Sequence, residues 1–154
     1  MRRHPRARRL QILFDMAEKA EQQALQEWGQ LQQKLHQEEE QRTQLSSYAN
    51  EYQQQLSVPS GKALSSGFLH NTLGFIGQIE TALKTQNEQI KLLQDRVTAA
   101  RNQYLEHHGK VKALSGLMDR LDHEYDQQAD KELQKQSDEW ANRAAFQNSR
   151  TPRT

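Results

Sequence analysis

Residues 57–67, SVPSGKALSSG, form the only turn-rich stretch between the two ends of the chain. Proline and glycine at this density interrupt regular helices and strands. Of the two other prolines, Pro5 fits the first turn of a starting helix, where a missing N–H costs nothing, and Pro152 lies in the tail. The stretch therefore divides the chain into two arms.

Each arm carries an apolar stripe in which the spacing alternates strictly between three and four residues, typical of the a and d positions of a left-handed coiled coil. The first stripe is Leu10, Phe14, Ala17, Glu21, Ala24, Trp28, Leu31, Leu35, Glu38, Arg42, Leu45, Ala49, Tyr52 and Leu56. The second is Ile76, Ile79, Leu83, Gln86, Ile90, Leu93, Val97, Ala100, Tyr104, His107, Val111, Leu114, Met118, Leu121 and Tyr125. A short loop between two such arms favours an all-α fold, a long two-helix antiparallel coiled-coil hairpin.

The hairpin predicts five segments. They are a basic N-terminal segment (1–9), helix 1 (10–56), the connecting turn (57–67), helix 2 with a C-terminal overhang (68–146) and a frayed tail (147–154).

The composition agrees with helices that bury only a narrow stripe. Only 34% of the 154 residues are apolar and the mean hydropathy is -1.07, which is too little apolar material for a compact core. Disorder is the other class with such a composition, but the regular periodicity and the net charge of +1 argue against it. The absence of cysteine, of a secretory signal and of an apolar run long enough to span a bilayer predicts a cytoplasmic protein.

Folding about the loop predicts the register of the hairpin, in which the numbers of facing residues add to about 124. In this register polar Glu38 faces polar Gln86. A different register would place the Glu38 carboxylate against aliphatic side chains, where its desolvation is unfavourable. The predicted contacts are Glu38 with Gln86, Glu21 with the Tyr104 hydroxyl, Trp28 with Val97, Glu27 with Arg96, His107 with Ala17, and Tyr48 with Phe75.

The two arms are unequal in length. Leu10 is predicted to meet Leu114, so residues beyond about 115 have little or no partner within the hairpin. This overhang still carries Leu117, Met118, Leu121, Tyr125, Leu133, Trp140, Ala144 and Phe146. An apolar stripe without an internal partner indicates a docking or self-association surface.

The sequence contains no constellation suited to catalysis or metal binding. Gly61-Lys62-Ala63 lacks the upstream glycine and the Ser/Thr of a phosphate-binding loop. No histidine has a second histidine three or four positions away, as a metal site on a helix requires, and His107 is interpreted as a seam residue. We expect neither an enzyme nor a cofactor.

The N-terminal segment is rich in arginine: Arg2, Arg3, Arg6, Arg8 and Arg9. Such residues could contact phosphates or an anionic membrane surface. A solvated end is favoured instead, because the rest of the chain lacks a basic stripe, and no nucleic-acid partner is expected.

Beside the turn, apolar residues occupy positions outside the two stripes, and the segments around them resemble those of a known family. Tyr48 and Phe75 occupy positions that are usually charged in a coiled coil. YANEYQQQL (48–56) and FLHNTLGFIGQIETAL (68–83) resemble the tip of the FliJ family, coiled-coil components of the flagellar type III export apparatus, and DEWANRAAF (138–146) resembles the family's C-terminal signature.

The resemblance implies a stalk-like, non-catalytic protein at the inner face of the cell membrane. It would insert into the flagellar export ATPase hexamer, connect it to the cytoplasmic domain of the membrane export-gate protein, and escort flagellar export chaperones. The implied gate-binding residues are Gln41, Leu45, Tyr48, Tyr52, Phe75, Ile79, Ala82 and Gln86, the last of which is often histidine in the family. The ATPase-facing open end would use Leu117, Leu121, Tyr125, Trp140, Arg143 and Phe146.

Three alternatives remain open from the sequence. The chain could be the stalk of a virulence-type injectisome, a homodimeric coiled-coil scaffold, or an arginine-anchored binder of nucleic acid or membrane. The hairpin predicts a monomer with a large frictional ratio, which separates it from the scaffold.

Overall fold

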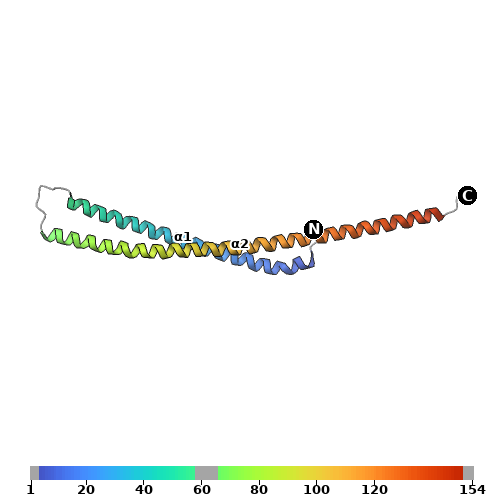
Figure 1. Ribbon diagram of the computed structural model, residues 1–154, viewed down its shortest axis with the longest axis horizontal. Coiled ribbons are helices and arrows are strands. Elements are labelled where there is room, and N and C mark those ends of the chain that lie inside the picture. Colours follow the sequence, from blue (N-terminus) through green and yellow to red (C-terminus); the bar gives the residue numbers. More distant parts are fainter. Residues whose placement is uncertain (1–3, 58–65, 151–154) are drawn as a thin grey trace. The chain divides into compact units, whose positions relative to one another are not determined.

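The computed structural model describes residues 4–57 and 66–150, and within them it contains two helices and no strand. Helix α1 spans Pro5–Ser57 and helix α2 spans Ser66–Arg150 (Figure 1). The all-α, two-helix prediction is confirmed. Pro59 and Gly61-Lys62-Ala63 lie outside the described residues.

Both helices are longer than the sequence predicts. Helix α1 begins at Pro5 and not at residue 10, because His4 caps it: the His4 Nδ1 atom accepts a hydrogen bond from the Arg6 amide at 2.9 Å. The Arg8 amide adds a bond to the His4 carbonyl at 3.1 Å. The basic segment is therefore helical from Pro5 onward.

At the other end, α2 continues to Arg150, so the first part of the predicted frayed tail is also helical. The Ser149 hydroxyl donates to the Phe146 carbonyl at 2.9 Å. This local bond from a side chain to the backbone lies in the last turns of α2.

The helices form two compact units. Unit 1 consists of Met1–Glu21 and His107–Thr154, and unit 2 of Gln22–Glu106. In each unit a segment of α1 packs against a segment of α2. Residues that follow one another along α1 contact residues in descending order along α2, so both pairings are antiparallel.

The seam between the helices follows the predicted stripes. Every predicted stripe residue is buried or half-buried, and Ile90, which is 2% exposed, is the most deeply buried of them. The stripes extend further than predicted, to Ala7 on α1 and Thr72 on α2, which are 0% and 7% exposed. Both additions continue the same helical spacing, which explains why these residues reach the seam.

The predicted contact between Glu38 and Gln86 is confirmed. The Gln86 amide nitrogen donates to Glu38 Oε2 at 3.3 Å. Other cross-helix contacts have partners further along α2 than the predicted register places them: Trp28 with Tyr104, Glu21 with His108, and Tyr52 with Phe75.

Side-chain direction explains this shift. Side chains on a helix tilt toward its N-terminus. In an antiparallel pair the two tilts converge, so long side chains meet partners that lie beyond the residue directly opposite. The stacked rings of Trp28 and Tyr104, 5.6 Å apart and 28° from parallel, are an example in unit 2.

The early start of α1 lengthens the paired part of unit 1. The His4 ring contacts Tyr125 edge-on at 5.6 Å, and the His4 amide donates to Asp122 Oδ1 at 2.7 Å. Met118 is buried. The prediction that residues beyond about 115 lack a partner is therefore wrong for 116–126. Among residues 130–149, every side chain except the half-buried Ala144 is exposed.

Candidate partner-binding surfaces

The first candidate surface lies in unit 2, where α1 ends and α2 begins. The rings of Tyr52 and Phe75 pack at 5.4 Å with an angle of 58° between their planes. Tyr52 is half-buried, whereas Phe75 is 51% exposed. Tyr48, one turn before Tyr52, is 53% exposed. Tyr52 therefore supports an exposed aromatic ring, and a second aromatic ring stands in solvent on the same helix.

About three helical turns further along α2 from Phe75, a polar cluster joins the helices. The Gln86 amide nitrogen donates to Gln41 Oε1 as well as to Glu38 Oε2, each at 3.3 Å. Gln86 is only 8% exposed, and its own Oε1 atom is buried without a hydrogen-bond partner. Close by, the Arg42 guanidinium donates to Asn87 Oδ1 at 3.4 Å. A buried amide held by two acceptors fixes how the helices meet at this level.

The eight residues predicted to bind the gate thus divide into two kinds. Four present exposed side chains: Gln41, Tyr48, Phe75 and Ala82. Four lie on the seam and support them: Leu45, Tyr52, Ile79 and Gln86. We call the exposed four, together with Tyr52, the tip flank. The sequence interpretation missed Phe68, Leu69 and Leu73, which are 46%, 40% and 54% exposed in the first turns of α2.

The second candidate surface lies in unit 1 on α2. Leu121 and Tyr125 are half-buried and Leu117 is 37% exposed, so these three belong mainly to the pairing with α1. Trp140 is 74% and Phe146 58% exposed, in the stretch 131–149 that we call the α2 extension. The six residues predicted to face the ATPase are thus not one patch, and only Trp140, Arg143 and Phe146 lie on the extension.

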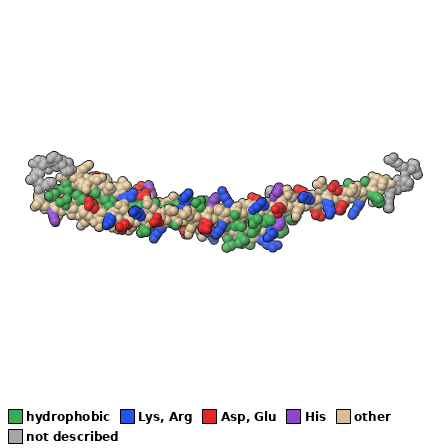
Figure 2. All heavy atoms as spheres, in the orientation of Figure 1, with side chains coloured by type: hydrophobic (Ala, Val, Ile, Leu, Met, Phe, Trp, Pro, Cys, Tyr) green, Lys and Arg blue, Asp and Glu red, His purple; other side chains and the backbone are tan. Residues whose placement is uncertain are grey.

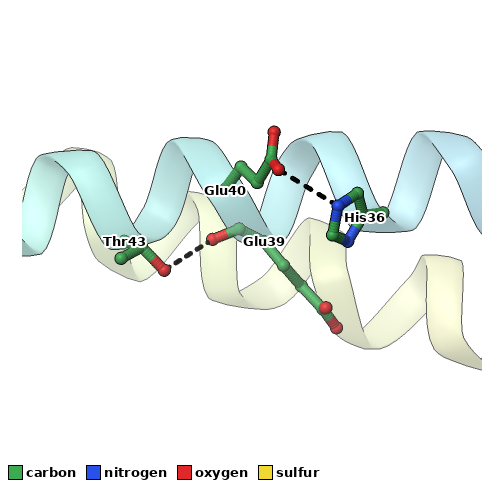
Figure 3. Close-up of polar contacts among 4 residues, drawn as sticks. All are labelled: His36, Glu39, Glu40 and Thr43. Carbon is green, nitrogen blue, oxygen red and sulfur yellow. Dashed lines mark hydrogen bonds and ion pairs between the residues drawn. The ribbon is translucent and has the colours of Figure 1, made fainter.

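Two histidines, His36 and His108, pair with glutamate side chains. His36 pairs with Glu40 at 3.0 Å on the exposed side of α1 (Figure 3). His108 meets Glu21 across the seam of unit 1 at 3.3 Å. No group of three or more His, Asp or Glu side chains in the described residues is placed to hold a metal ion.

Neither α1 nor α2, as far as the structure describes them, contains a stretch apolar enough over a sufficient length to cross a bilayer.

Comparison with known proteins supports the resemblance in the sequence. The family described as "Flagellar FliJ protein" matches residues 6–150. The chain is 30% identical over 137 residues to the Flagellar FliJ protein of Salmonella typhi and 29% identical over 137 residues to that of Escherichia coli K12. Each alignment covers 89% of this chain and 93% of the relative. No solved structure matches. Two paired helices with a match over nearly their whole length show that the chain belongs to the FliJ family.

Proposed function

We propose that the protein is the stalk component of the flagellar type III export apparatus. In this role it inserts into the ring of the export ATPase, links the ring to the membrane export gate, and escorts export chaperones in the cytoplasm at the flagellar base. Membership of the FliJ family indicates a flagellar export-related protein. The observation that carries the finer proposal is the exposed α2 extension with Trp140.

The α2 extension is the surface proposed to enter the ATPase ring. Trp140 and Arg143 are three residues apart and therefore neighbours on one helical face. Tryptophan and arginine are the side chains most enriched among residues that dominate binding energy. An indole that is 74% exposed gains most of its burial energy only when a partner covers it.

The proposed action on the ring is allosteric and requires no catalytic group in this chain. A single pair of helices cannot contact all subunits of a roughly sixfold ring equally. It biases one subunit interface at a time and so promotes assembly or turnover of the ring. Coupling of this kind is typically about 1–3 kcal/mol.

The tip flank is the surface proposed to bind the export gate. Tyr48 and Phe75 present aromatic area at low conformational cost, since each ring has only two side-chain torsions. Tyr52 holds the Phe75 ring in place, and the Gln86 cluster fixes the level at which the two helices meet. The two proposed surfaces lie in different units, so each can be disrupted separately.

The test is a pull-down of the full chain with purified export ATPase and, separately, with the cytoplasmic domain of the gate. Phe75→Ala and Tyr48→Ala are expected to lose gate binding and keep ATPase binding, whereas Trp140→Ala is expected to do the reverse. Leu92→Ala is the matched control for Phe75, because Leu92 is a 61% exposed apolar residue of the same unit outside the tip flank.

A kinetic experiment tests the proposed action on the ring. The hydrolysis rate of the ATPase is measured over a range of concentrations of the full chain, and a rise is expected with wild type and not with Trp140→Ala. A rate that stays constant with wild type at every concentration would count decisively against insertion. Light scattering checks the accompanying proposal that the chain alone is a monomer.

A further inference from the structure

A third exposed surface remains, at the N-terminal end of α1 in unit 1. Ile12, Leu13 and Met16 are 67%, 53% and 65% exposed. Their spacing of three and four residues places them on one side of the helix. Figure 2 shows hydrophobic side chains gathered over this part of α1, with lysine and arginine side chains beside them. Neither the seam nor the two surfaces proposed above uses these residues.

The charges around this apolar group are mostly positive. Arg6, Arg8, Arg9 and Lys19 are all exposed. Arg8 and Arg9 precede Ile12 and Leu13 by one turn, and Lys19 follows Met16 by one turn, so the cations frame the apolar group. We call these seven residues the basic apolar face: Arg6, Arg8, Arg9, Ile12, Leu13, Met16 and Lys19.

The acidic residues of the same turns do not cancel this charge. Between Pro5 and Ala20 they are Asp15 and Glu18, against four cations. Asp15 accepts a hydrogen bond from the Gln11 side chain at 2.9 Å, and Gln11 is half-buried toward the seam. The basic apolar face therefore keeps a positive potential next to exposed apolar area.

The opposite side of these turns limits which partner can bind. Ala7 is fully buried, and Leu10 and Phe14 are half-buried against α2. A partner that must enclose a helix in a groove is therefore blocked on one side. A nucleic acid would use the four cations but would leave three apolar side chains in water. A broad surface with anionic groups outside and an apolar interior matches both halves of the face.

An apolar groove adjoins this face. Arg6 and Arg9 border a groove of about 220 Å³ formed with Leu10, Leu117 and Leu121. Apolar surface therefore continues from α1 toward α2 within unit 1, and two cations stand at its edge. This arrangement suits an acyl chain below an anionic headgroup.

We propose that the basic apolar face binds the surface of anionic phospholipid membranes directly. Ile12, Leu13 and Met16 enter the boundary between headgroups and acyl chains, and the four cations contact the phosphates. Basic residues at an anionic surface and apolar side chains at its boundary act together, because neither alone gives stable attachment. This contact requires no gate protein and is independent of the stalk function.

The test is co-sedimentation of the full chain with phospholipid vesicles. Wild type is expected to bind vesicles of phosphatidylcholine mixed with phosphatidylglycerol, to release them at high salt, and not to bind phosphatidylcholine alone. The double variant Ile12→Gln/Met16→Gln is expected to lose about tenfold or more in partition to the mixed vesicles. Arg8→Gln/Arg9→Gln is expected to weaken binding and to reduce its salt dependence.

Leu25→Gln is the matched control, because Leu25 is an apolar residue of α1 that is 48% exposed and lies outside the face. Its partition should equal that of wild type, and circular dichroism should show equal helix content in all variants. Equal binding of wild type and Ile12→Gln/Met16→Gln would overturn the proposal. The proposal is also overturned if wild type does not bind the mixed vesicles. This holds even where Ile12→Gln/Met16→Gln loses a protein partner or an oligonucleotide in a parallel pull-down.

Discussion

Unit 2 and the paired part of unit 1 follow the same apolar spacing but hold α1 and α2 together by different means. The seam of unit 2 buries branched aliphatic side chains: Ile76, Ile79, Ile90 and Leu93. In unit 1 the buried residues are Ala7 and Met118 among those the structure describes. Cross-helix bonds in the described part of this unit include Glu21 with His108 and His4 with Asp122, and the ring of His4 contacts Tyr125.

This difference teaches that periodicity locates a seam without setting its strength. A fully buried isoleucine or leucine contributes about 1.5–3 kcal/mol. A partly exposed ion pair contributes at most about 1 kcal/mol. We therefore expect unit 2 to supply most of the stability of the pairing. Unit 1, which carries the α2 extension and the basic apolar face, is expected to open more easily.

The largest expected effect on stability is in unit 2, which is expected to supply most of the stability of the pairing. Ile90→Ala should lower the free energy of unfolding by about 2–5 kcal/mol, because Ile90 is 2% exposed and its loss leaves a cavity on the seam. Urea unfolding followed by helical circular dichroism measures it. Leu92→Ala is the control at a 61% exposed position and should change stability by less than about 0.5 kcal/mol. Equal effects of the two variants would contradict the comparison.

A smaller effect is expected at the polar cluster of unit 2. Gln86→Leu should cost about 1–3 kcal/mol, because it removes both hydrogen bonds to Glu38 and Gln41. The double variant Glu38→Leu/Gln86→Leu should recover the loss, since it replaces both partners by apolar groups and removes the unpaired Gln86 Oε1. The same unfolding measurement applies. A double variant less stable than Gln86→Leu would show that the cluster stabilises the seam.

A still smaller effect is expected at the ion pair of unit 1. Glu21→Gln should lower stability by no more than about 1 kcal/mol, because the His108 side chain is 38% exposed and solvent screens the pair. Unfolding at low and high salt measures it. Glu40→Gln, which breaks the more exposed His36 pair within α1, is the matched control and should have no measurable effect. A loss as large as that of Ile90→Ala would reverse the ranking of the two units.

The smallest effect on stability is expected in the α2 extension. Trp140→Ala should change the free energy of unfolding by less than about 0.5 kcal/mol, because the side chain is 74% exposed. The same variant should show a marked loss of ATPase binding in the pull-down. A large destabilisation would mean that Trp140 serves the fold and would remove it as evidence for a docking surface.

The sequence predicts the seam well because burial along a helix depends on local spacing. Every predicted stripe residue is at least half-buried, and the pairing of Glu38 with Gln86 is confirmed. The sequence predicts contact partners less well, because spacing places backbones and ignores the tilt of long side chains. The stacking of Trp28 on Tyr104, for example, is not among the predicted contacts.

The surfaces were predictable only in part. The exposure of Phe75 follows from its position off the seam, and that of Trp140 from its position beyond the start of α1. The start of α1 at Pro5 agrees with the position of that proline in a first helical turn, whereas His4, which caps the helix, is not a residue that helix-start rules favour. Ile12, Leu13 and Met16 were missed although the signal was present: three apolar residues off the seam, one turn after two arginines.

The exposure of the α2 extension has a consequence for how any partner binds it. Helices that lack tertiary packing are marginal in water and lie close to a helix–coil equilibrium. A partner that binds Trp140 must therefore also order the helical turns around it, and the conformational entropy lost in this ordering weakens binding. A substitution that raises helix propensity at Asn142, which lies two residues from Trp140 and so on another side of the helix, should strengthen binding without changing the contact surface.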